Sequence, residues 1–294
     1  MQAIHNSTAQ NPRWVLREMP QAIWGVDLSD VAAATMADGL VAVELLNEGQ
    51  QAIQELEDLK RVNARLFPRE LPRLASVAYA GVCVEARYVG GDFYDFFDFG
   101  AHRLGLAIGD VSGKSAASAL LRATLQASLR ALRLTGLNDM DAQLTLANRL
   151  LLESAPEAMY ASLFLAEYDE QSWRLRYVNC GHPAPALLRR GEVIWLQPMA
   201  TVLGLFKDWQ CSIAEVRLQP GDTLLLYTDG ITEATDAAGE EFGANRLIET
   251  LIAQDHLPVS ALLQFCVNAV RRFAQGTPCD DLTLVALRCS ERER

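Results

Sequence analysis

Four aspartates share one sequence context: Asp92, Asp110, Asp229 and Asp280 each lie where a strand-like apolar run ends or begins. Each also stands beside a glycine or a second acid. Strand ends are where a scaffold presents side chains to a cleft. If the strand after Asp280 runs antiparallel to those ending at Asp110 and Asp229, these three carboxylates meet at one sheet edge.

Clustered carboxylates raise one another's pKa, so such a cluster stays ionised only with cations bound. A ligand set made of oxygens suits Mg²⁺ or Mn²⁺. Taken singly, each aspartate is better explained as a turn or capping residue, but four in the same setting favour a cation site. We expect Asp95 and Asp281 to support these ligands from behind, and Asp98 to lie in solvent.

A phosphate-binding P-loop is the competing interpretation of Gly113-Lys114-Ser115, which follows an apolar run. That motif needs four residues between its glycines, whereas Gly109 leaves three. Asp110 would also repel phosphate. The spacing therefore disfavours a P-loop, and Lys114 is better explained as a solvated lysine at a helix start than as a ligand of a substrate phosphate.

No other nucleophile or base has a convincing setting. His182, in Asn-Cys-Gly-His-Pro, could be a general acid, but a turn histidine with a satisfied hydrogen bond is the favoured interpretation. The sequence holds no GxSxG motif, and no cysteine lies in an activating context.

Residues after Pro72 alternate short apolar runs with turns, and helical patterns come in pairs. This layout predicts an α+β fold with antiparallel sheets rather than strict βαβ alternation. The expected organisation is an N-terminal arm (1–27), a helix (28–67) and one large domain (68–290).

The helix is expected to mediate dimerisation or transmit a signal; the alternative is an amphipathic helix lying on its own domain. A heptad register can be written over 45–67, and an Asn at an a position is a known device for fixing a two-stranded register. Pro68 and Pro72 then end the helix. The d positions are Leu45, Ala52, Leu59 and Leu66, and the a positions are Gly49, Leu56 and Asn63.

Composition narrows the function classes further. The 294 residues carry a formal net charge of −11, which argues against a nucleic-acid partner or an anionic membrane surface. The six cysteines form no CxxC pair and suggest reduced thiols in a cytoplasmic protein. The four histidines form no zinc motif, the start is no signal peptide, and the run 31–46 is too short and charged for a membrane span.

Five segments occur in a fixed order: GGDFYDFF, GDVSGKS, YVNCGHPAP, PGDTLLLYTDGITEA and CDDLTLVAL. With them, about residues 64–288 resemble the SpoIIE-type (RsbU-like) phosphatases, the bacterial branch of the protein phosphatase 2C-like (PPM) superfamily. LFPRELP also resembles the segment that leads into that domain.

The resemblance implies two stacked antiparallel β-sheets flanked by helix pairs, preceded here by an N-terminal helical segment. It implies two Mn²⁺ or Mg²⁺ ions, with Asp110 bridging both. Asp92 and the carbonyl of Val111 would hold one ion, and Asp229 and Asp280 the other. A water activated between the metals would attack the phosphorus of a phosphoserine or phosphothreonine.

The family's usual substrate is an anti-sigma-factor antagonist in a partner-switching pathway, and we expect the N-terminal helix to mediate homodimerisation or to dock an activator. The alternative is a catalytically weak, partner-binding module of the same fold, which the four intact carboxylates disfavour. Ser115 and Ser162 stand where the family often has Gly and Thr, which leaves turn geometry open. By the same resemblance, the segment 204–210 (GLFKDWQ) corresponds to a variable loop, which we expect to help select the partner.

Overall fold

The computed structural model describes residues 39–68, 72–100, 102–113, 115–134, 139–156, 158–276 and 279–290, with backbone alone at 39–48 and 133–134. The predicted arm and the start of the predicted helix lie outside the described residues. The chain divides into two compact units, residues 1–58 and 59–294.

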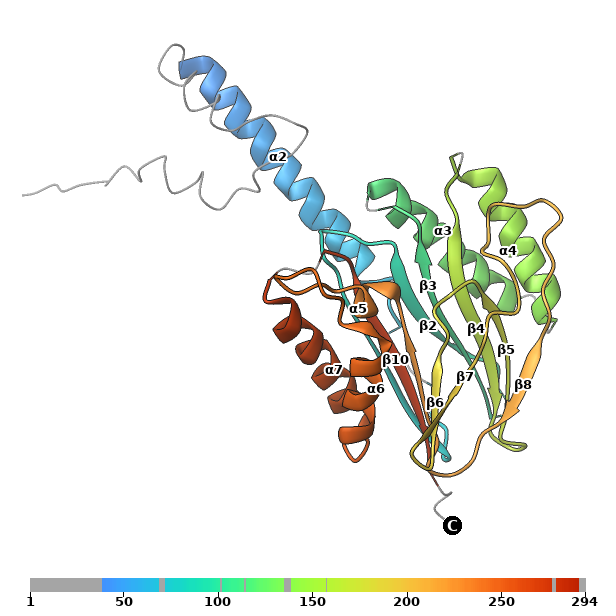
Figure 1. Cartoon of the computed structure of the whole chain (residues 1–294). Helices are drawn as coiled ribbons and strands as arrows, with labels where there is room; N and C mark the ends of the chain where they lie inside the picture. Colours follow the sequence, from blue (N-terminus) through green and yellow to red (C-terminus); the bar gives the residue numbers. More distant parts are fainter. Residues whose placement is uncertain are drawn as a thin grey trace, which may run out of the picture. The chain divides into compact units, whose positions relative to one another are not determined.

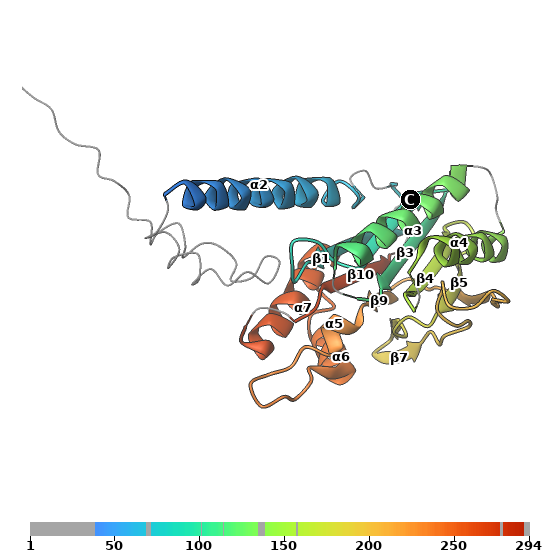
Figure 2. The same cartoon turned by 90° about the horizontal axis from the view of Figure 1, so that it is seen from above.

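Two antiparallel sheets of five strands each are stacked in the second unit (Figures 1 and 2). We name them the β1 sheet and the β2 sheet. The β1 sheet has the order β1 (Val77–Val84), β10 (Leu282–Cys289), β9 (Thr223–Tyr227), β6 (Ala186–Arg189), β7 (Glu192–Trp195). The β2 sheet has the order β2 (Asp92–Asp98), β3 (Arg103–Val111), β4 (Ala161–Asp169), β5 (Arg174–Cys180), β8 (Ala214–Arg217).

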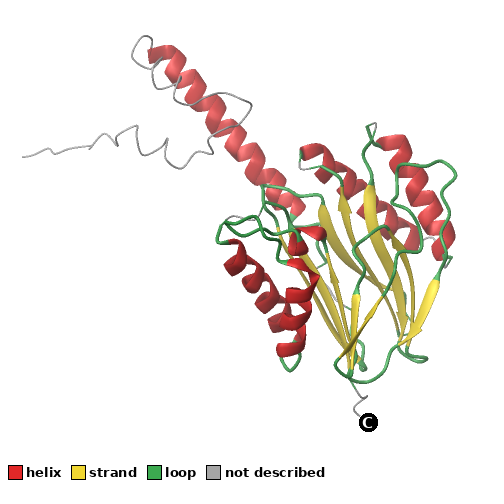
Figure 3. Cartoon of the chain, viewed as in Figure 1, coloured by secondary structure: helices red, strands yellow, loops and turns green. Residues whose placement is uncertain are grey.

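Helices cover the outer face of each sheet, as the colouring by secondary structure shows (Figure 3). The β2 sheet packs against α3 (Ala116–Leu134) and α4 (Met140–Ser154). The β1 sheet packs against α6 (Gly243–Ala253) and α7 (Val259–Ala274), next to the one-turn helix α5 (Asp229–Thr232). The predicted α+β sandwich with flanking helix pairs is confirmed.

The strands alternate their side chains between two cores, because successive residues of a strand point to opposite faces. On β3, Leu104, Leu106 and Ile108 enter the core between the sheets, whereas Ala107 and Val111 face α3 and α4. By the same alternation Asp110 points inward, with the inter-sheet residues.

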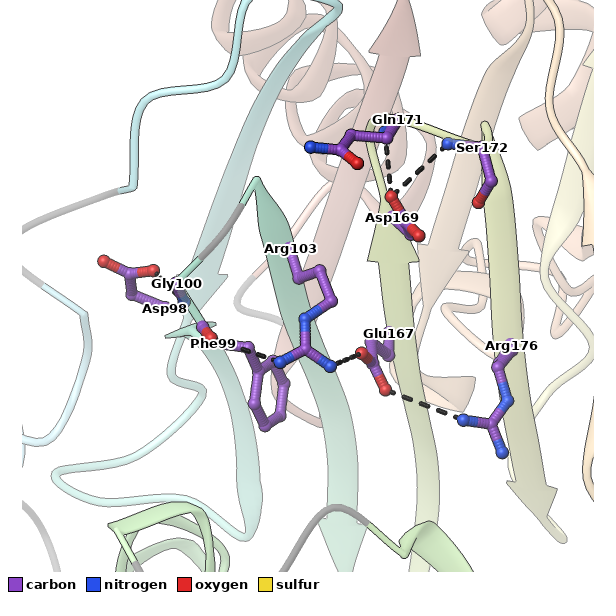
Figure 4. Close-up of polar contacts among 9 residues, drawn as sticks. All are labelled: Asp98, Phe99, Gly100, Arg103, Glu167, Asp169, Gln171, Ser172 and Arg176. Carbon is purple, nitrogen blue, oxygen red and sulfur yellow. Dashed lines mark hydrogen bonds and ion pairs between the residues drawn. The ribbon is translucent and has the colours of Figure 1, made fainter. Parts of the chain in front are cut away.

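A cross-strand network fixes the β2 sheet at the end remote from Asp110 (Figure 4). Glu167 accepts a hydrogen bond from Arg103 (2.9 Å) and lies 3.9 Å from Arg176, so one carboxylate joins three neighbouring strands. In the following turn, Asp169 accepts from the backbone N–H of Gln171 (2.8 Å). These contacts pin the register on which the opposite end depends.

The N-terminal helical segment is confirmed as α2 (Gly39–Asn63), whose last residues belong to the second unit. Asn63 is 4% exposed, and its amide donates to the carboxylate of Glu85 in the same chain. Its expected role at the a position of a two-stranded coil is therefore corrected: this side chain faces its own domain. The side chain of Leu45 lies outside the described residues.

The inter-sheet core predicts a clear contrast between two leucines. Leu106 is fully buried, whereas Leu120 on α3 is 70% exposed. Leu106→Ala should lower the free energy of unfolding by about 2–5 kcal/mol, because it leaves a cavity in a close-packed core. Leu120→Ala should change it by less than about 0.5 kcal/mol. Urea unfolding of both variants measures this, and equal effects would contradict the assigned core.

Candidate functional site

The four aspartates come from both sheets and meet at one end of the sandwich. Asp92 and Asp110 are direct cross-strand partners on β2 and β3. Asp280 precedes β10, which runs antiparallel to β9, and Asp229 follows β9. The charges of Asp229 and Asp280 raise the pKa of Asp110, so the two pairs lie within electrostatic reach of each other.

One detail differs from the sequence prediction. The strand β9 ends at Tyr227, and Asp229 is the first residue of α5 rather than the last of the strand. Thr228 intervenes in an extended conformation. The first turn of a helix is a favourable place for a carboxylate, although α5 has a single turn.

A pocket opens at this end of the sandwich. The pocket is lined by residues of the loop before β2 and by residues near the end of β3 and the start of β10. They are Ala86, Arg87, Val89, Gly90, Gly91, Asp110, Gly113, Cys279, Asp280 and Asp281. Arg87 is exposed and was not singled out from the sequence. A guanidinium at the mouth of an acidic pocket is a group that suits a phosphate oxyanion.

Two glycines allow the backbone to approach the acids. A Cβ on Gly91 would lie 2.4 Å from the carbonyl oxygen of Val111 and 2.9 Å from Asp110 Oδ1. A Cβ on Gly90 would lie 1.6 Å from Asp281 Oδ2. Any larger residue would fill the space beside the Val111 carbonyl and the Asp110 carboxylate, so a cradle of oxygen atoms depends on these glycines.

Buried hydroxyl and amide groups hold Asp92 in place. Thr228 donates to Asp92 Oδ2 (2.7 Å), and the hydroxyl of Thr228 accepts from the backbone N–H of Thr283 (3.2 Å). Asp281 accepts from the N–H of Ala86 (2.9 Å) and from that of Asp92 (3.5 Å). Asp281 thus takes the supporting place predicted for it, whereas the two threonines were missed because nothing local in the sequence marks them.

Burial and mutual repulsion raise the pKa of two carboxyl groups in the site, and a bound cation would relieve that repulsion. Burial, followed by the charges of Asp229 and Asp280, raises the pKa of Asp110 to about 7. Burial, followed by the charge of Asp110, raises the pKa of Asp92 well above its usual value. In the described parts of the chain, no three acidic, histidine or cysteine side chains are gathered tightly enough to hold a metal ion as they stand. The carboxylates are neighbours at one end of the sandwich rather than a closed coordination sphere.

Two other predicted acids lie elsewhere. Asp95 projects from the opposite face of β2, where it accepts hydrogen bonds from Gln126 (3.1 Å) and Arg130 (2.5 Å) of α3. Its expected role behind the ligands is corrected: Asp95 anchors α3. Asp98 is exposed at the far end of β2 and accepts from the N–H of Gly100 (2.7 Å), as expected for a surface acid.

The two residues that depart from the family pattern have local partners. Ser115 directly precedes α3, and its hydroxyl accepts from the N–H of Ala117 (3.2 Å), as a helix-capping serine does. Ser162 lies opposite Asp110 in the β-ladder and bonds Nδ1 of His182 (2.8 Å). Lys114 lies outside the described residues.

His182 is a hydrogen-bonded turn histidine, as favoured from the sequence, rather than a general acid. Its N–H donates to Asn179 Oδ1 (2.8 Å), the ring is buried, and burial lowers its pKa to about 3. A ring that is neutral at physiological pH cannot give up a proton as a general acid.

Comparison with known proteins agrees with this arrangement. The family model described as "Stage II sporulation protein E (SpoIIE)" matches residues 100–290. The chain belongs to the SpoIIE family. It is 28% identical over 260 residues to Protein IcfG of Synechocystis, covering 79% of this chain but 41% of IcfG. It is 25% identical over 245 residues to Phosphoserine phosphatase RsbU of Bacillus subtilis, covering 81% of this chain and 71% of RsbU.

Solved structures share the fold of this SpoIIE-family chain. The SiaA-PP2C domain of Pseudomonas aeruginosa superposes with a TM-score of 0.72 at 21% identity, covering 81% of this chain and 97% of that one. The catalytic domain of the phosphatase PstP, solved with two manganese ions, gives a TM-score of 0.56 at 18% identity, covering 74% and 99%. Among the described residues, no helix is long and apolar enough to cross a membrane.

The raised pKa of Asp110 predicts a pH-dependent stability. Without metal, the Asp110 carboxyl group of the folded protein keeps its proton up to about pH 7, whereas in the unfolded chain it releases the proton at about pH 4. The folded state is therefore stabilised as the pH falls from 8 toward 5 and loses that stability as the pH rises. At pH 8 in EDTA, Asp110→Asn should raise the unfolding midpoint by roughly 2–8 °C, with little change at pH 5.

Thermal unfolding of wild type and Asp110→Asn at both pH values tests this. Mn²⁺ should raise the wild-type midpoint more at pH 8 than at pH 6, and should not stabilise the variant. A variant that is less stable than wild type at pH 8 in EDTA would contradict the account.

Proposed function

We propose that this chain is a metal-dependent protein-serine/threonine phosphatase that hydrolyses a phosphoserine or phosphothreonine with two Mn²⁺ or Mg²⁺ ions. One observation carries the proposal: in a SpoIIE-family chain, aspartates from both sheets meet beside one pocket, which Asp110 and Asp280 line, and the charges of Asp229 and Asp280 add to burial in raising the pKa of Asp110. The names of RsbU and RsbP as phosphoserine phosphatases and the manganese ions of PstP support it.

The residues present fit two hard cations. Aspartate carboxylates and a main-chain carbonyl are the oxygen ligands that Mg²⁺ and Mn²⁺ prefer. We assign Asp92 and the carbonyl of Val111 to one ion, Asp229 and Asp280 to the other, and Asp110 to both. The space that Gly91 leaves beside the Val111 oxygen and the Asp110 carboxylate supports this assignment.

When bound, such ions lower the pKa of water and stabilise the charge of an in-line displacement at phosphorus. The chain's own residues orient the groups. Thr228 and Asp281 fix Asp92, and Arg87 lies where it can bind the oxygens of the incoming phosphate. Binding one phosphate between fixed charges supplies the positioning on which phosphoryl transfer depends.

A covalent phosphoenzyme is not part of this proposal. Burial raises the pKa of Cys180, Cys211, Cys266 and Cys289, so these thiols are poor nucleophiles at neutral pH. His182 is buried and bonded to Ser162. Direct attack by water is consistent with a site that offers ligands but no activated nucleophile.

The substrate we propose is a phosphorylated protein resembling an anti-sigma-factor antagonist, in a cytoplasmic partner-switching pathway. The support is similarity to RsbU and to the RsbU and RsbW domains of Rv1364c from Mycobacterium tuberculosis. We further propose that residues 28–67 mediate homodimerisation or dock an activator, with 1–27 as an arm and 68–290 as the phosphatase domain. Leu59 and Val62, 39% and 60% exposed near the end of α2, are apolar contacts available for this.

Loss of one carboxylate assigned to the ions should strongly reduce turnover. Asp110→Ala and Asp229→Ala should each lower Mn²⁺-dependent phosphate release from a phosphoserine protein or generic phosphoester by at least about 100-fold, as should EDTA. Asp98→Ala, on the same strand as Asp92 but at its exposed end, is the control and should retain activity. Activity that survives EDTA and both substitutions would exclude the metal mechanism; full-length chain that binds its partner without hydrolysis would favour the partner-binding module.

The proposed dimer makes a separate prediction. Leu59→Glu together with Val62→Glu should convert a dimer into a monomer in sedimentation equilibrium, because charge is placed on an apolar contact. The control is Lys60→Glu with Arg61→Glu, which changes neighbouring exposed positions without touching apolar ones. A dimer that survives the first pair, or dissociates equally with the second, would refute dimerisation through this face.

A further inference from the structure

A fully buried arginine lies behind the site rather than in it. Arg122 on α3 is fully buried, and it is among the largest side chains with no exposed surface. A buried charge is expensive unless it is paired and hydrogen-bonded. Among the described residues, its Nε and Nη2 atoms have no hydrogen-bond partner. Because its burial costs free energy, we expect the contacts that Arg122 does make to have a role.

Within the described part of the chain, its one hydrogen bond goes to the backbone of a proposed ligand. Nη1 of Arg122 donates to the main-chain oxygen of Asp92 (2.8 Å) and lies 3.7 Å from Glu85 Oε1. The guanidinium also stacks over Phe67, with 4.9 Å to the ring centroid. One side chain thus connects α3, the first residue of β2, and the segments on either side of β1.

The position of Asp92 explains why this bond matters. β2 is an edge strand, so every second carbonyl lacks a strand partner. Gly91 O accepts from Val111 N (3.2 Å), so the next carbonyl, that of Asp92, points away from β3 toward the open edge. Arg122 supplies the missing donor at the residue whose carboxylate faces Asp110.

We propose that Arg122 is a positioning residue for metal binding: it fixes the main chain at Asp92 and so sets the separation of the Asp92 and Asp110 carboxylates. The inference rests on the proposed function in that it takes Asp92 as a ligand. It acts through Asp92 and has no contact with substrate in this account.

The same helix provides a matched control. Arg130 also links α3 to β2 and to the end of the α2 segment, through Asp95 (2.5 Å) and the carbonyl of Leu66. Its partner Asp95 projects to the opposite face of β2 from Asp92. Loss of Arg130 removes a similar structural tie without touching a proposed ligand.

The test measures Mn²⁺ binding by titration calorimetry on the full chain, with folding checked by circular dichroism and thermal unfolding in EDTA. Arg122→Met should raise the Mn²⁺ dissociation constant at least tenfold, Arg130→Met less than twofold, and Arg122→Lys should fall between wild type and Arg122→Met. The Mn²⁺ concentration for half-maximal phosphatase activity should shift in parallel, with kcat at saturating Mn²⁺ changed less than threefold.

Three results would overturn the proposal: wild-type affinity in Arg122→Met, an equal loss in Arg130→Met, or a lysine variant as weak as the methionine variant. If Arg122→Met does not fold, the Arg122→Lys variant tests the proposal instead. Mn²⁺ binding at least threefold weaker than wild type, with an unchanged unfolding midpoint, would support the positioning role of Arg122. Wild-type Mn²⁺ affinity in this variant would overturn it. A wild-type chain that binds Mn²⁺ but releases no phosphate would refute the phosphatase and leave the role of Arg122 standing. A wild-type chain that binds no Mn²⁺ would overturn both.

Discussion

Repulsion among carboxylates is the constraint on which this structure depends. Asp92, Asp110, Asp229 and Asp280 gather at one end of a β-sandwich, where Asp110 and Asp280 line a pocket, and burial followed by neighbouring carboxylate charges raises the pKa of Asp92 and Asp110. Such an arrangement costs stability unless protons or cations neutralise it. A scaffold that keeps the arrangement gains a site whose charge bound cations can balance, which is the property that the proposed metal-dependent hydrolase needs.

The fold keeps these charges together by placing them on elements that cannot move apart. Asp92 and Asp110 are paired across one ladder, and Asp229 and Asp280 follow and precede adjacent antiparallel strands of the other sheet. Gly90 and Gly91 let the backbone approach Asp281 and the Val111 carbonyl. Thr228 and Arg122 then restrain Asp92 through its carboxylate and its main-chain oxygen. Restraints on both groups limit how far this proposed ligand can move from its neighbours.

Much of the fold and of the candidate site could be predicted from the sequence, because local residue patterns mark the strands and the acids at their ends. Short apolar runs separated by turns predicted the strands, and acids beside glycines marked the strand ends. Asp95 was misplaced although the rule that corrects it is simple: three residues after Asp92 on a strand, a side chain points to the opposite face. Asn63 was misassigned because a heptad pattern does not say which surface a helix covers. Thr228, Arg87 and Arg122 were missed because their importance comes from partners distant in sequence.

Anomalous diffraction from crystals of the full chain grown with Mn²⁺ tests the central claim most directly. The account predicts two manganese peaks in the pocket, both in contact with the Asp110 carboxylate, with Asp92 at one and Asp229 and Asp280 at the other. A pocket without manganese at saturating concentration, or ions held by residues other than these aspartates, would contradict it.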